Sequence, residues 1–449
     1  MSQSHSRVFV VGAGFAGLEA ARALADAPVA VTVVDRRNHH VFQPLLYQVA
    51  TASLSPADIC APIRTVLRGQ ANCEVLLAEV TGIDVSARRL AIDGQSVAYD
   101  YLVLAAGATH AYFGHDEWAH VAPGLKTIED ALELRRRILL AFESAEHEPD
   151  DGARRASLTF GIVGGGATGV ELAGAIKEIA GQTIPKDYKH IDTRTTRVIL
   201  FEAADRLLPP FAPKSSARAQ RDLEKMGVEV RLRSTVTNVT RDGIHLGAEF
   251  IRVRNVFWAA GVRANPLGAS LGVPLDRAGR VIVGPDLTMP GHPEVFVVGD
   301  MAAARRAPDR DERVPGVAQG GIQMGRYAGG TIARGMRGRS TPRERAPFVY
   351  RDRGSMAVIG KAKAVVEIGR FRCGGSFAWL IWGLIHIYFL IGFRNRVLVF
   401  LSWFWNWLLN ARDARLITGD VRGPVLLDQS LDQNASSTAI NRPASGSQT

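Results

Sequence analysis

Cysteine is scarce in this sequence, and the three that occur are not spaced as a reactive pair. Cys60, Cys73 and Cys373 stand far apart, and none belongs to a CxxC or CxxxxC motif. Such spacing argues against a redox-active dithiol and is typical of reduced, partly buried thiols in a cytosolic protein. Chemistry that runs through a cysteine pair is therefore not expected.

Other familiar signals are missing as well. The polar segment 1–7 runs straight into an apolar stretch and leaves no room for a signal or transit peptide, so we expect the body of the protein on the cytoplasmic side. The sequence has no zinc-finger spacing, no long run of Lys and Arg, and no D-x-[DN]-x-[DN]-G calcium loop. We therefore expect neither a metal site nor a nucleic-acid partner. The net charge of +10 instead favours an anionic membrane surface, because much of the excess lies near an apolar C-terminal region.

Glycine, by contrast, is abundant, and many of the glycines fall into one pattern that occurs twice. The first copy has an apolar run at 8–11, GAGFAG at 12–17, a helical stretch and a strand that ends at Asp35. The second copy has an apolar run at 158–163, GGGATG at 164–169, a helical stretch and a strand that ends at Glu202. Each copy is a βαβ unit, so the pattern predicts an α/β fold with two Rossmann-like dinucleotide-binding domains.

The positions of these glycines have a physical reason. The first glycine of each loop permits a tight turn, the second lets the backbone approach a pyrophosphate, and the third lets the helix pack on the strand. The helix N-terminus then presents free N–H groups to the phosphates. The acid that ends each second strand accepts hydrogen bonds from ribose hydroxyls, and these acids are Asp35 and Glu202. Glu202 also favours NADH over NADPH, because a 2′-phosphate beside a carboxylate is a like-charge contact.

The order of further strands indicates that one nucleotide domain is inserted in the other. Buried strands at 99–104, 255–258 and 295–298 each end in a turn of small residues, and the last turn is Gly299-Asp300. We expect residues 1–112 and 265–345 to form one discontinuous domain and residues 113–264 to form the inserted domain.

Beyond residue 346 the character of the sequence changes. We expect a membrane-anchoring region with amphipathic helices at 346–425 and a disordered, Ser/Asn/Gln-rich tail at 426–449. Residues 373–393 and 397–410 carry no charge, and five of the seven tryptophans lie within 376–409, where indole rings would lie at the headgroup level. A single span would put Arg394, Arg396, Arg412 and Arg415 on the far side, against the positive-inside bias, so we expect two helices lying in the interface. A buried dimer interface made by the same helices is the alternative, and both can hold.

Several stretches resemble the type II NADH:quinone oxidoreductases, which are single-subunit enzymes that do not pump protons. They are GAGFAGLEAA at 12–21, FQPLLYQVATASLSP at 42–56, GGGATGVELAGAI at 164–176, VVGDMA at 297–302, AQGGIQMG at 318–325 and FLIGFRNRVLVFLSWFWNW at 389–407. The nucleotide motifs are shared by all flavoproteins with two dinucleotide sites. The AQxxxQ segment and the aromatic C-terminal region are the most specific part of the likeness, which extends to about residue 420.

The resemblance implies FAD in the first unit and NADH in the second. The residues implied for FAD are Gly12, Gly14, Phe15, Ala16, Gly17, Asp35, Thr51, Val80, Asp300 and Ala318. The residues implied for NADH are Gly164, Gly166, Gly169, Glu202 and Gly261. Gln319, Gln323 and Lys361 are implied to border a quinone, and Glu171 to relay a proton near it. From the residues alone, Gln319 and Gln323 share one helical face and also suit a solvated polar pair, while Glu171 also suits a carboxylate favoured by the helix dipole.

The resemblance further implies the reaction and its setting. Hydride passes from NADH to FAD, and two electrons pass on to a membrane quinone, either ubiquinone or menaquinone, without proton pumping. A homodimer bound as a peripheral, monotopic protein on the cytoplasmic side of the cell inner membrane is implied. Two alternatives stay open: a reductase of a soluble protein acceptor, which would not need the aromatic C-terminal helices, and an NADH-sensing flavoprotein. The lack of a cysteine pair disfavours disulfide reductases and sulfide:quinone oxidoreductases.

Overall fold

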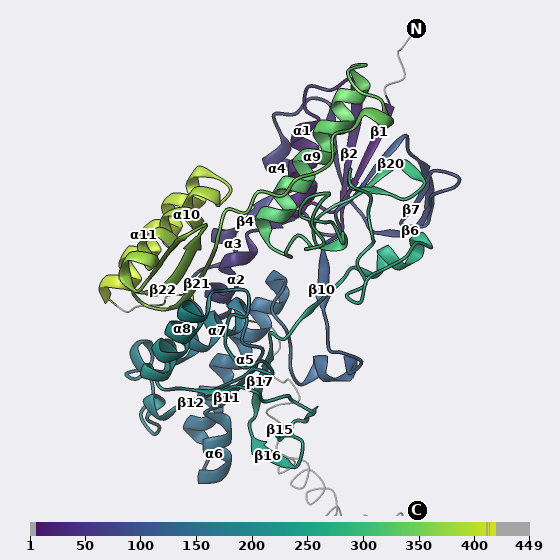
Figure 1. Ribbon diagram of the computed structural model, residues 1–449. Coiled ribbons are helices and arrows are strands. Elements are labelled where there is room, and N and C mark those ends of the chain that lie inside the picture. The colour runs from purple at the N-terminus through teal and green to yellow at the C-terminus, as the bar shows by residue number, and fades with distance from the viewer. Residues whose placement is uncertain (1–5, 410–411, 413, 419–449) are drawn as a thin grey trace, which may run out of the picture.

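The protein has two sheets of mainly parallel strands, which lie one above the other in Figure 1. A smaller C-terminal layer lies to one side of them. The computed structural model describes residues 6–409, 412 and 414–418, so the tail expected at 426–449 lies outside the described residues. In Figure 1 the sheet that contains β1 and β2 lies at the top and the sheet that contains β11 and β12 at the bottom. The antiparallel layer of β21 and β22 lies to the left with α10 and α11.

The first sheet joins strands from distant parts of the chain. Its order is β19-β20-β9-β1-β2-β5, and its antiparallel pair is β19 and β20. The strands are β1 (Ser6–Val11), β2 (Val29–Asp35), β5 (Cys73–Leu77), β9 (Tyr101–Leu104), β19 (Thr288–Met289) and β20 (His292–Val297). Strands β1, β9 and β20 contain short runs of Val, Leu and Phe that are buried on both faces, as expected for a sheet covered by helices.

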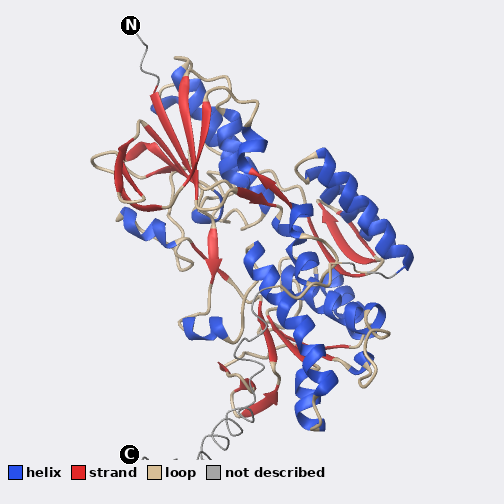
Figure 2. Ribbon diagram, turned by 180° about the vertical axis from the view of Figure 1, so that it is seen from behind, coloured by secondary structure: helices blue, strands red, loops and turns tan. Residues whose placement is uncertain are grey.

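Two helices from distant parts of the chain pack together beside this sheet (Figures 1 and 2). They are α1 (Phe15–Ala23) and α9 (Ala318–Met336). Small residues let their backbones approach closely. A Cβ atom at Gly325 would lie 2.0 Å from the carbonyl oxygen of Ala16, and a Cβ at Gly329 would lie 2.3 Å from that of Ala20. Only glycine fits at these two positions.

The second sheet is entirely parallel and is formed by one continuous part of the chain. Its order is β13-β12-β11-β17, with β11 (Thr159–Val163), β12 (Arg197–Phe201), β13 (Val228–Arg231) and β17 (Asn255–Trp258). Its helices are α5 (Ile128–His147), α6 (Asp151–Ser157), α7 (Ala167–Glu178) and α8 (Pro213–Lys225). One π-helical turn (Ile179–Thr183) continues α7 into the polar segment that precedes β12.

Smaller elements connect and edge the two sheets. Short helices are α2 (Leu46–Ala50), α3 (Pro56–Ile59) and α4 (Ile63–Leu67). Paired strands are β3 (His39–Val41) with β4 (Cys60–Pro62), and β10 (Ala108–His110) with β18 (Val262–Ala264). Three-stranded antiparallel sheets are β6 (Val80–Asp84), β7 (Arg89–Ile92) and β8 (Gln95–Ala98), and β14 (Asn238–Val239), β15 (Gly243–Leu246) and β16 (Glu249–Arg252).

The C-terminal region forms a sheet and two apolar helices. The sheet has β21 (Ser355–Gly360), β22 (Lys363–Ile368) and β23 (Phe371–Gly374), and the two uncharged runs form α10 (Ser376–Phe389) and α11 (Phe393–Leu409). Strand β21 packs on α7, because Gly174 has no side chain: a Cβ there would lie 1.7 Å from the carbonyl oxygen of Ile359. Among the described helices, none is both long and apolar enough to cross a membrane.

Candidate functional site

The two glycine loops have the same geometry. Gly12 and Gly164 adopt left-handed backbone angles, with φ of 97° and 110°. A Cβ at Gly17 would lie 1.8 Å from the carbonyl oxygen of Gly12, and a Cβ at Gly169 would lie 1.8 Å from that of Gly164. The first and third glycines of each loop are therefore required by the turn and by the contact between helix and strand.

The middle glycine of each loop faces open space. A Cβ at Gly14 or at Gly166 would meet no atom within 4 Å. The helices that follow begin at Phe15 and Ala167, and no side chain caps their N-terminal N–H groups. Free N–H groups beside an open cradle suit a pyrophosphate, so both loops fit the group predicted for them.

The two acids after the loops also lie alike. Asp35 accepts hydrogen bonds from the backbone N–H of Ala13 at 2.6 Å and of Arg37 at 2.8 Å. Glu202 accepts hydrogen bonds from the backbone N–H of Gly165 at 2.5 Å and of Ala204 at 2.7 Å. Each carboxylate thus lies against its own glycine loop, where the ribose of a bound dinucleotide would meet it.

A cavity of about 490 Å³ opens over the first loop, and we call it the nucleotide cavity. Most of the residues predicted for FAD line it: Gly12, Gly14, Phe15, Ala16, Asp35, Val80, Asp300 and Ala318. Gly17 lies behind the loop and does not line it, because its role is to pack the helix on the strand. Thr51 does not line the cavity either: its side chain bonds the carbonyl of Tyr47 and is buried. The structure does not bring Thr51 to the cavity surface.

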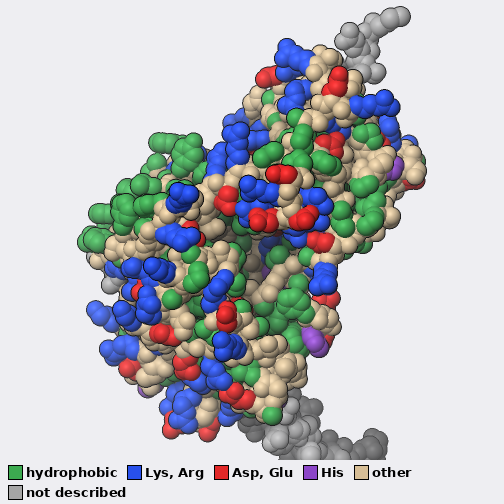
Figure 3. Space-filling model, viewed as in Figure 1, with side chains coloured by type: hydrophobic (Ala, Val, Ile, Leu, Met, Phe, Trp, Pro, Cys, Tyr) green, Lys and Arg blue, Asp and Glu red, His purple; other side chains and the backbone are tan. Residues whose placement is uncertain are grey.

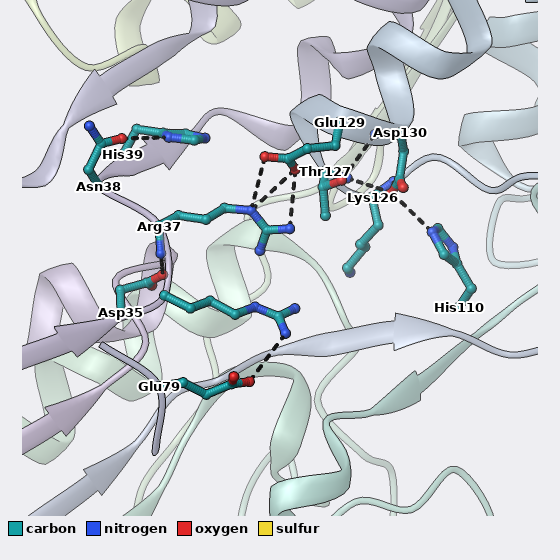
Figure 4. Close-up of polar contacts among 11 residues, drawn as sticks. Asp35, Arg37, Asn38, His39, Glu79, His110, Lys126, Thr127, Glu129 and Asp130 are labelled. Atoms are coloured by element: carbon teal, nitrogen blue, oxygen red, sulfur yellow. Dashed lines mark hydrogen bonds and ion pairs between the residues drawn. The ribbon is translucent and has the colours of Figure 1, made fainter. Parts of the chain in front are cut away.

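Three pairs of side chains, two of them ion pairs, lie at one wall of the nucleotide cavity. They join the start of α5 to residues outside the inserted unit. Lys126 Nζ lies 3.0 Å from Asp300 Oδ2, and His110 Nε2 lies 3.0 Å from Asp130 Oδ2. The third pair joins Arg37 and Glu129 at 3.2 Å; Figure 4 shows it together with the pair of His110 and Asp130.

The helix start itself holds this wall in place. Thr127 and Asp130 form a capping box, in which Thr127 Oγ1 accepts from the N–H of Asp130 and the Asp130 carboxylate accepts from the N–H of Thr127. Burial raises the pKa of Asp130, but the hydrogen bonds from His110 and from the backbone outweigh it, so the net pKa is lowered. The carboxylate therefore stays charged. No motif in the sequence marks Lys126, since only the fold brings it to Asp300.

A second cavity, of about 110 Å³, lies between α7, β21 and the C-terminal helices, and we call it the aromatic cavity. Its walls include Trp379, Trp382, Trp403 and Trp407. Two residues predicted near the quinone line it, Glu171 and Lys361. Further lining groups that the sequence analysis did not single out for a site are Tyr47, Gln48, Glu178 and Arg412.

Glu171 is buried in this cavity without a cationic partner among the described residues. Burial raises the pKa of its carboxyl to about 8, against a weak opposing hydrogen bond from the N–H of Val358 at 3.4 Å. At neutral pH Glu171 therefore carries a proton. Lys361, which also lines this cavity, donates from Nζ to the carbonyl of Trp407 at 2.7 Å.

Gln319 and Gln323 lie elsewhere. Gln319 bonds the carbonyl of Gly354 and the N–H of Arg353, and Gln323 bonds the carbonyl and the N–H of Arg351. The two amides share one face of α9, as predicted, and they fix the backbone of 351–354 to that helix. Neither lines the nucleotide cavity or the aromatic cavity, and their role beside a quinone stays a prediction.

Arg412 follows the apolar C-terminal helices but does not face the surface. Its guanidinium is buried, 2.9 Å from Glu178 Oε2, and it also donates to the carbonyls of Thr51 and Ala175. Arg415 is paired with Asp187. These two arginines face protein because the chain turns back onto α7 after α11.

The tryptophans of the C-terminal helices also differ in how far they are buried. Trp382 is buried and Trp403 is half-buried against the body of the protein, so these two do not lie at a headgroup level as expected. Trp405 and Trp407 are about half exposed. The exposed side chains of α10 and α11 form an apolar face, visible as the green area at the left of Figure 3. It comprises Phe377, Leu380, Leu384, Tyr388, Phe393, Val397, Phe400, Leu401, Phe404, Trp405, Trp407 and Leu408.

Comparison with known proteins places the chain in a family. Residues 6–325 match the pyridine nucleotide-disulphide oxidoreductase family, and residues 353–413 match the NDH2 C-terminal domain. The type II NADH:quinone oxidoreductase NdhA of Mycobacterium tuberculosis is 46% identical over 443 residues, which cover 96% of this chain and 93% of that protein. The chain is a type II NADH:quinone oxidoreductase by family. A second relative from the same organism, named Ndh, is 47% identical over 92% of this chain and 90% of its own length.

A solved structure agrees with the fold of these enzymes. NDH2 of Plasmodium falciparum, in complex with NADH, superposes with a TM-score of 0.82 and covers 92% of this chain and 100% of its own. The sequences are 18% identical, so this likeness concerns the fold. The predicted family and α/β class are confirmed.

Proposed function

We propose that this type II enzyme oxidises NADH at the second glycine loop, holds FAD in the nucleotide cavity and reduces a quinone in the aromatic cavity. Bound FAD supplies a two-electron carrier that takes hydride from NADH and gives electrons to the quinone. The observation that carries the proposal is Glu171, a protonated, buried carboxyl in a cavity walled by tryptophans next to the apolar face. A quinone needs protons as well as electrons, and it dissolves in lipid.

The residues of the chain hold and orient the ligands. The loops at 12–17 and 164–169 bind the two pyrophosphates, and Asp35 and Glu202 bind the two riboses. Asp300, at the edge of the nucleotide cavity, binds FAD beside Lys126. Gly261 lies on the NADH side, where a Cβ would lie 2.9 Å from the exposed ring of Phe113. Orientation of this kind can lower the barrier to hydride transfer by about 7–11 kcal/mol.

Glu171 holds a proton at its carboxyl for the quinone. Glu171 lies on α7 of the second sheet, and it contacts β21 through the N–H of Val358. This placement suits a group that serves the second half of the reaction. Gln319 and Gln323 support β21 indirectly, since they fix residues 351–354 just before it.

We further propose that the apolar face lies in the lipid interface, on the cytoplasmic side of the cell inner membrane. Arg394 and Arg396 lie at the junction of α10 and α11, where they suit anionic headgroups, each contributing about 1 kcal/mol. The proposal includes a homodimer, in which part of the apolar face pairs with a second copy. The boundaries 1–112 with 265–345, 113–264 and 346–425 belong to the same proposal, and the two sheets support them.

Two assays test the proposal. Purified, FAD-loaded protein is mixed with NADH and a short-chain quinone, and with NADPH in place of NADH. Fast quinone-dependent oxidation of NADH and little of NADPH supports the assignment, whereas bleaching of the flavin without quinone turnover refutes the quinone site. For the membrane, Phe400→Asp should reduce sedimentation with anionic vesicles, while Phe250→Asp, at an exposed position on β16, should not.

A further inference from the structure

A chain of hydrogen bonds runs from the apolar helix α11 into the aromatic cavity. Trp403, on α11, donates from its indole Nε1 to the side-chain oxygen of Gln48 at 2.7 Å. Gln48 in turn donates from its amide nitrogen to the hydroxyl oxygen of Tyr47 at 3.0 Å. All three residues line the cavity, and Tyr47 and Gln48 are buried.

The bond from Trp403 to Gln48 determines which group donates and which accepts in each of the two hydrogen bonds. An indole N–H can only donate, so the atom of Gln48 that faces Trp403 must be the carbonyl oxygen. The amide orientation, which is ambiguous for an isolated glutamine, is therefore fixed. The amide nitrogen must then face Tyr47, and it donates to the phenolic oxygen.

The second bond leaves the phenolic hydrogen of Tyr47 without a partner. Within the described part of the chain, no acceptor for that hydrogen lies within hydrogen-bond distance of the hydroxyl. Tyr47 lines the aromatic cavity, whose volume of about 110 Å³ holds several waters or part of a planar ligand. A buried donor without an acceptor is unfavourable, so an occupant that supplies an acceptor is favoured.

We propose that Tyr47 is a quinone-binding residue, whose hydroxyl donates a hydrogen bond to a carbonyl oxygen of the quinone. Gln48 and Trp403 are positioning residues that hold the hydroxyl in the donating orientation. The inference rests on the proposed function, because it takes the aromatic cavity as the quinone site.

The chemistry of the cavity suits a neutral, planar ligand with a carbonyl group. Trp379, Trp382 and Trp407 offer flat apolar surfaces, and Glu171, which carries a proton at neutral pH, adds no charge beside them. Burial, and then the nearby Glu171, raise the pKa of Tyr47 well above its usual range. The hydroxyl thus keeps its proton over the working pH range and acts as a donor only.

The link to α11 gives Trp403 a role that its neighbours lack. Trp405 lies two positions along the same helix, about half exposed, in the apolar face. If Trp403 loses its N–H, the amide of Gln48 becomes free to rotate, and its carbonyl oxygen can then accept the phenolic hydrogen. The quinone would compete with Gln48 for that hydrogen.

The test is a double-mutant cycle on the holoenzyme. Tyr47→Phe removes the hydroxyl and keeps the ring, and it should raise the KM for a short-chain quinone about 3- to 10-fold. The rate at which NADH reduces the bound flavin should stay unchanged, and so should the thermal midpoint within a few degrees. Trp403→Phe should raise the same KM about 2- to 5-fold, while Trp405→Phe, the matched control, should leave it unchanged.

The double variant shows whether Tyr47 and Trp403 affect the quinone KM through the same hydrogen bonds or independently. Tyr47→Phe with Trp403→Phe should show no more loss than Tyr47→Phe alone, because Trp403 acts only through the hydroxyl. Additive losses would overturn the positioning role of Trp403, and an unchanged KM in Tyr47→Phe would overturn the inference as a whole.

A further variant keeps failure of the inference distinct from failure of the quinone site. Ser53 lines the cavity and its side chain makes no hydrogen bond among the described residues, so Ser53→Phe should narrow the space and raise the quinone KM. If Ser53→Phe raises it and Tyr47→Phe does not, the quinone lies in the cavity but does not bond Tyr47. If neither variant changes it, the quinone binds elsewhere and the proposed site is wrong.

Discussion

The two nucleotide units carry a glutamate at the same place in the same motif, yet the two carboxyls have opposite surroundings. Glu19 and Glu171 each stand two positions after the last glycine of their loop. Glu19 pairs with Arg22 at 3.0 Å and with Arg326 at 2.5 Å. Glu171 is buried in the aromatic cavity, and burial raises its pKa to about 8. The comparison teaches that the motif fixes where the carboxyl lies, while the neighbouring elements fix whether it holds a proton.

The loops differ in a second way. The first loop lies under the nucleotide cavity, whose wall is tied by the side-chain pairs of Lys126, Glu129 and Asp130 to other segments. The acid of the second loop, Glu202, makes no ion pair among the described residues, and the loop lines neither cavity described above. A cavity wall that side-chain pairs hold in place suits a cofactor that stays bound. A loop without such pairs suits a substrate that leaves after each turnover.

Breaking one loop should leave the other intact. In Gly169→Val the new side chain would overlap the carbonyl of Gly164, so flavin reduction by NADH should fall by at least about 100-fold. The FAD content, read from visible absorbance, should stay at the wild-type level. Gly69→Ala, at a glycine outside both loops where a Cβ would meet no atom within 4 Å, serves as the matched control. Loss of FAD from Gly169→Val would show that the two units do not fold independently.

The two glutamates should respond differently to the same substitution. Glu171→Gln removes the proton donor and should lower kcat with quinone about 100-fold, whereas Glu19→Gln should leave it unchanged. The wild-type kcat should fall as the pH rises through about 8, where Glu171 loses its proton, and the variant should lack that fall. Steady-state rates between pH 6 and 9 give both results.

The raised pKa of Glu171 also makes stability depend on pH. The folded protein binds this proton more tightly than the unfolded chain, so the free energy of unfolding should fall as the pH rises from the ordinary glutamate range to about 8. Denaturant unfolding at pH 6 and pH 8.5 should show a larger difference for the wild type than for Glu171→Gln. An equal difference would assign the pH dependence to other groups.

Substitution of each acid that follows a glycine loop should affect a different nucleotide site. Glu202→Ala removes the carboxylate that would repel a 2′-phosphate, so the preference for NADH over NADPH should fall about 10- to 100-fold in kcat/KM. Asp35→Ala should weaken FAD binding and leave this preference as it is. A preference that survives in Glu202→Ala would assign the selectivity to another residue.

The smallest expected effect is on FAD affinity, when an ion pair at the wall of the nucleotide cavity is broken. Lys126→Met leaves Asp300 without its cation and should raise the dissociation constant of FAD about 3- to 10-fold. Arg37→Met breaks the more exposed pair with Glu129 and should change it less. Release of FAD, followed by its fluorescence, compares the two variants.

Local spacing was enough to predict much of this molecule. The two βαβ units, the turns of Gly12 and Gly164, and the shared helical face of Gln319 and Gln323 all follow from residues close together in the chain. The pairing of Lys126 with Asp300 does not, because it joins residues that only the fold brings together. Thr51, which the resemblance assigns to FAD, has a buried side chain that does not line the nucleotide cavity.

The C-terminal region shows the same limit. The pattern of α11 does not tell Trp403, which bonds Gln48, from Trp405, which is exposed, since both sit in one uncharged run. The burial of Arg412 also depends on a long-range partner, Glu178. Composition predicted the apolar face but not which side chains turn inward.

The contact between α1 and α9 has a consequence for how the protein is made. Gly325 and Gly329 pack on the backbone of Ala16 and Ala20, so the first unit needs residues that the ribosome delivers some 300 positions later. Chains emerge at about 5–20 residues per second, and units fold as they become complete. The second sheet, formed by residues 159–258, is then complete while the N-terminal strands still await their last helix. During synthesis the nascent chain would thus finish its interior unit before its beginning.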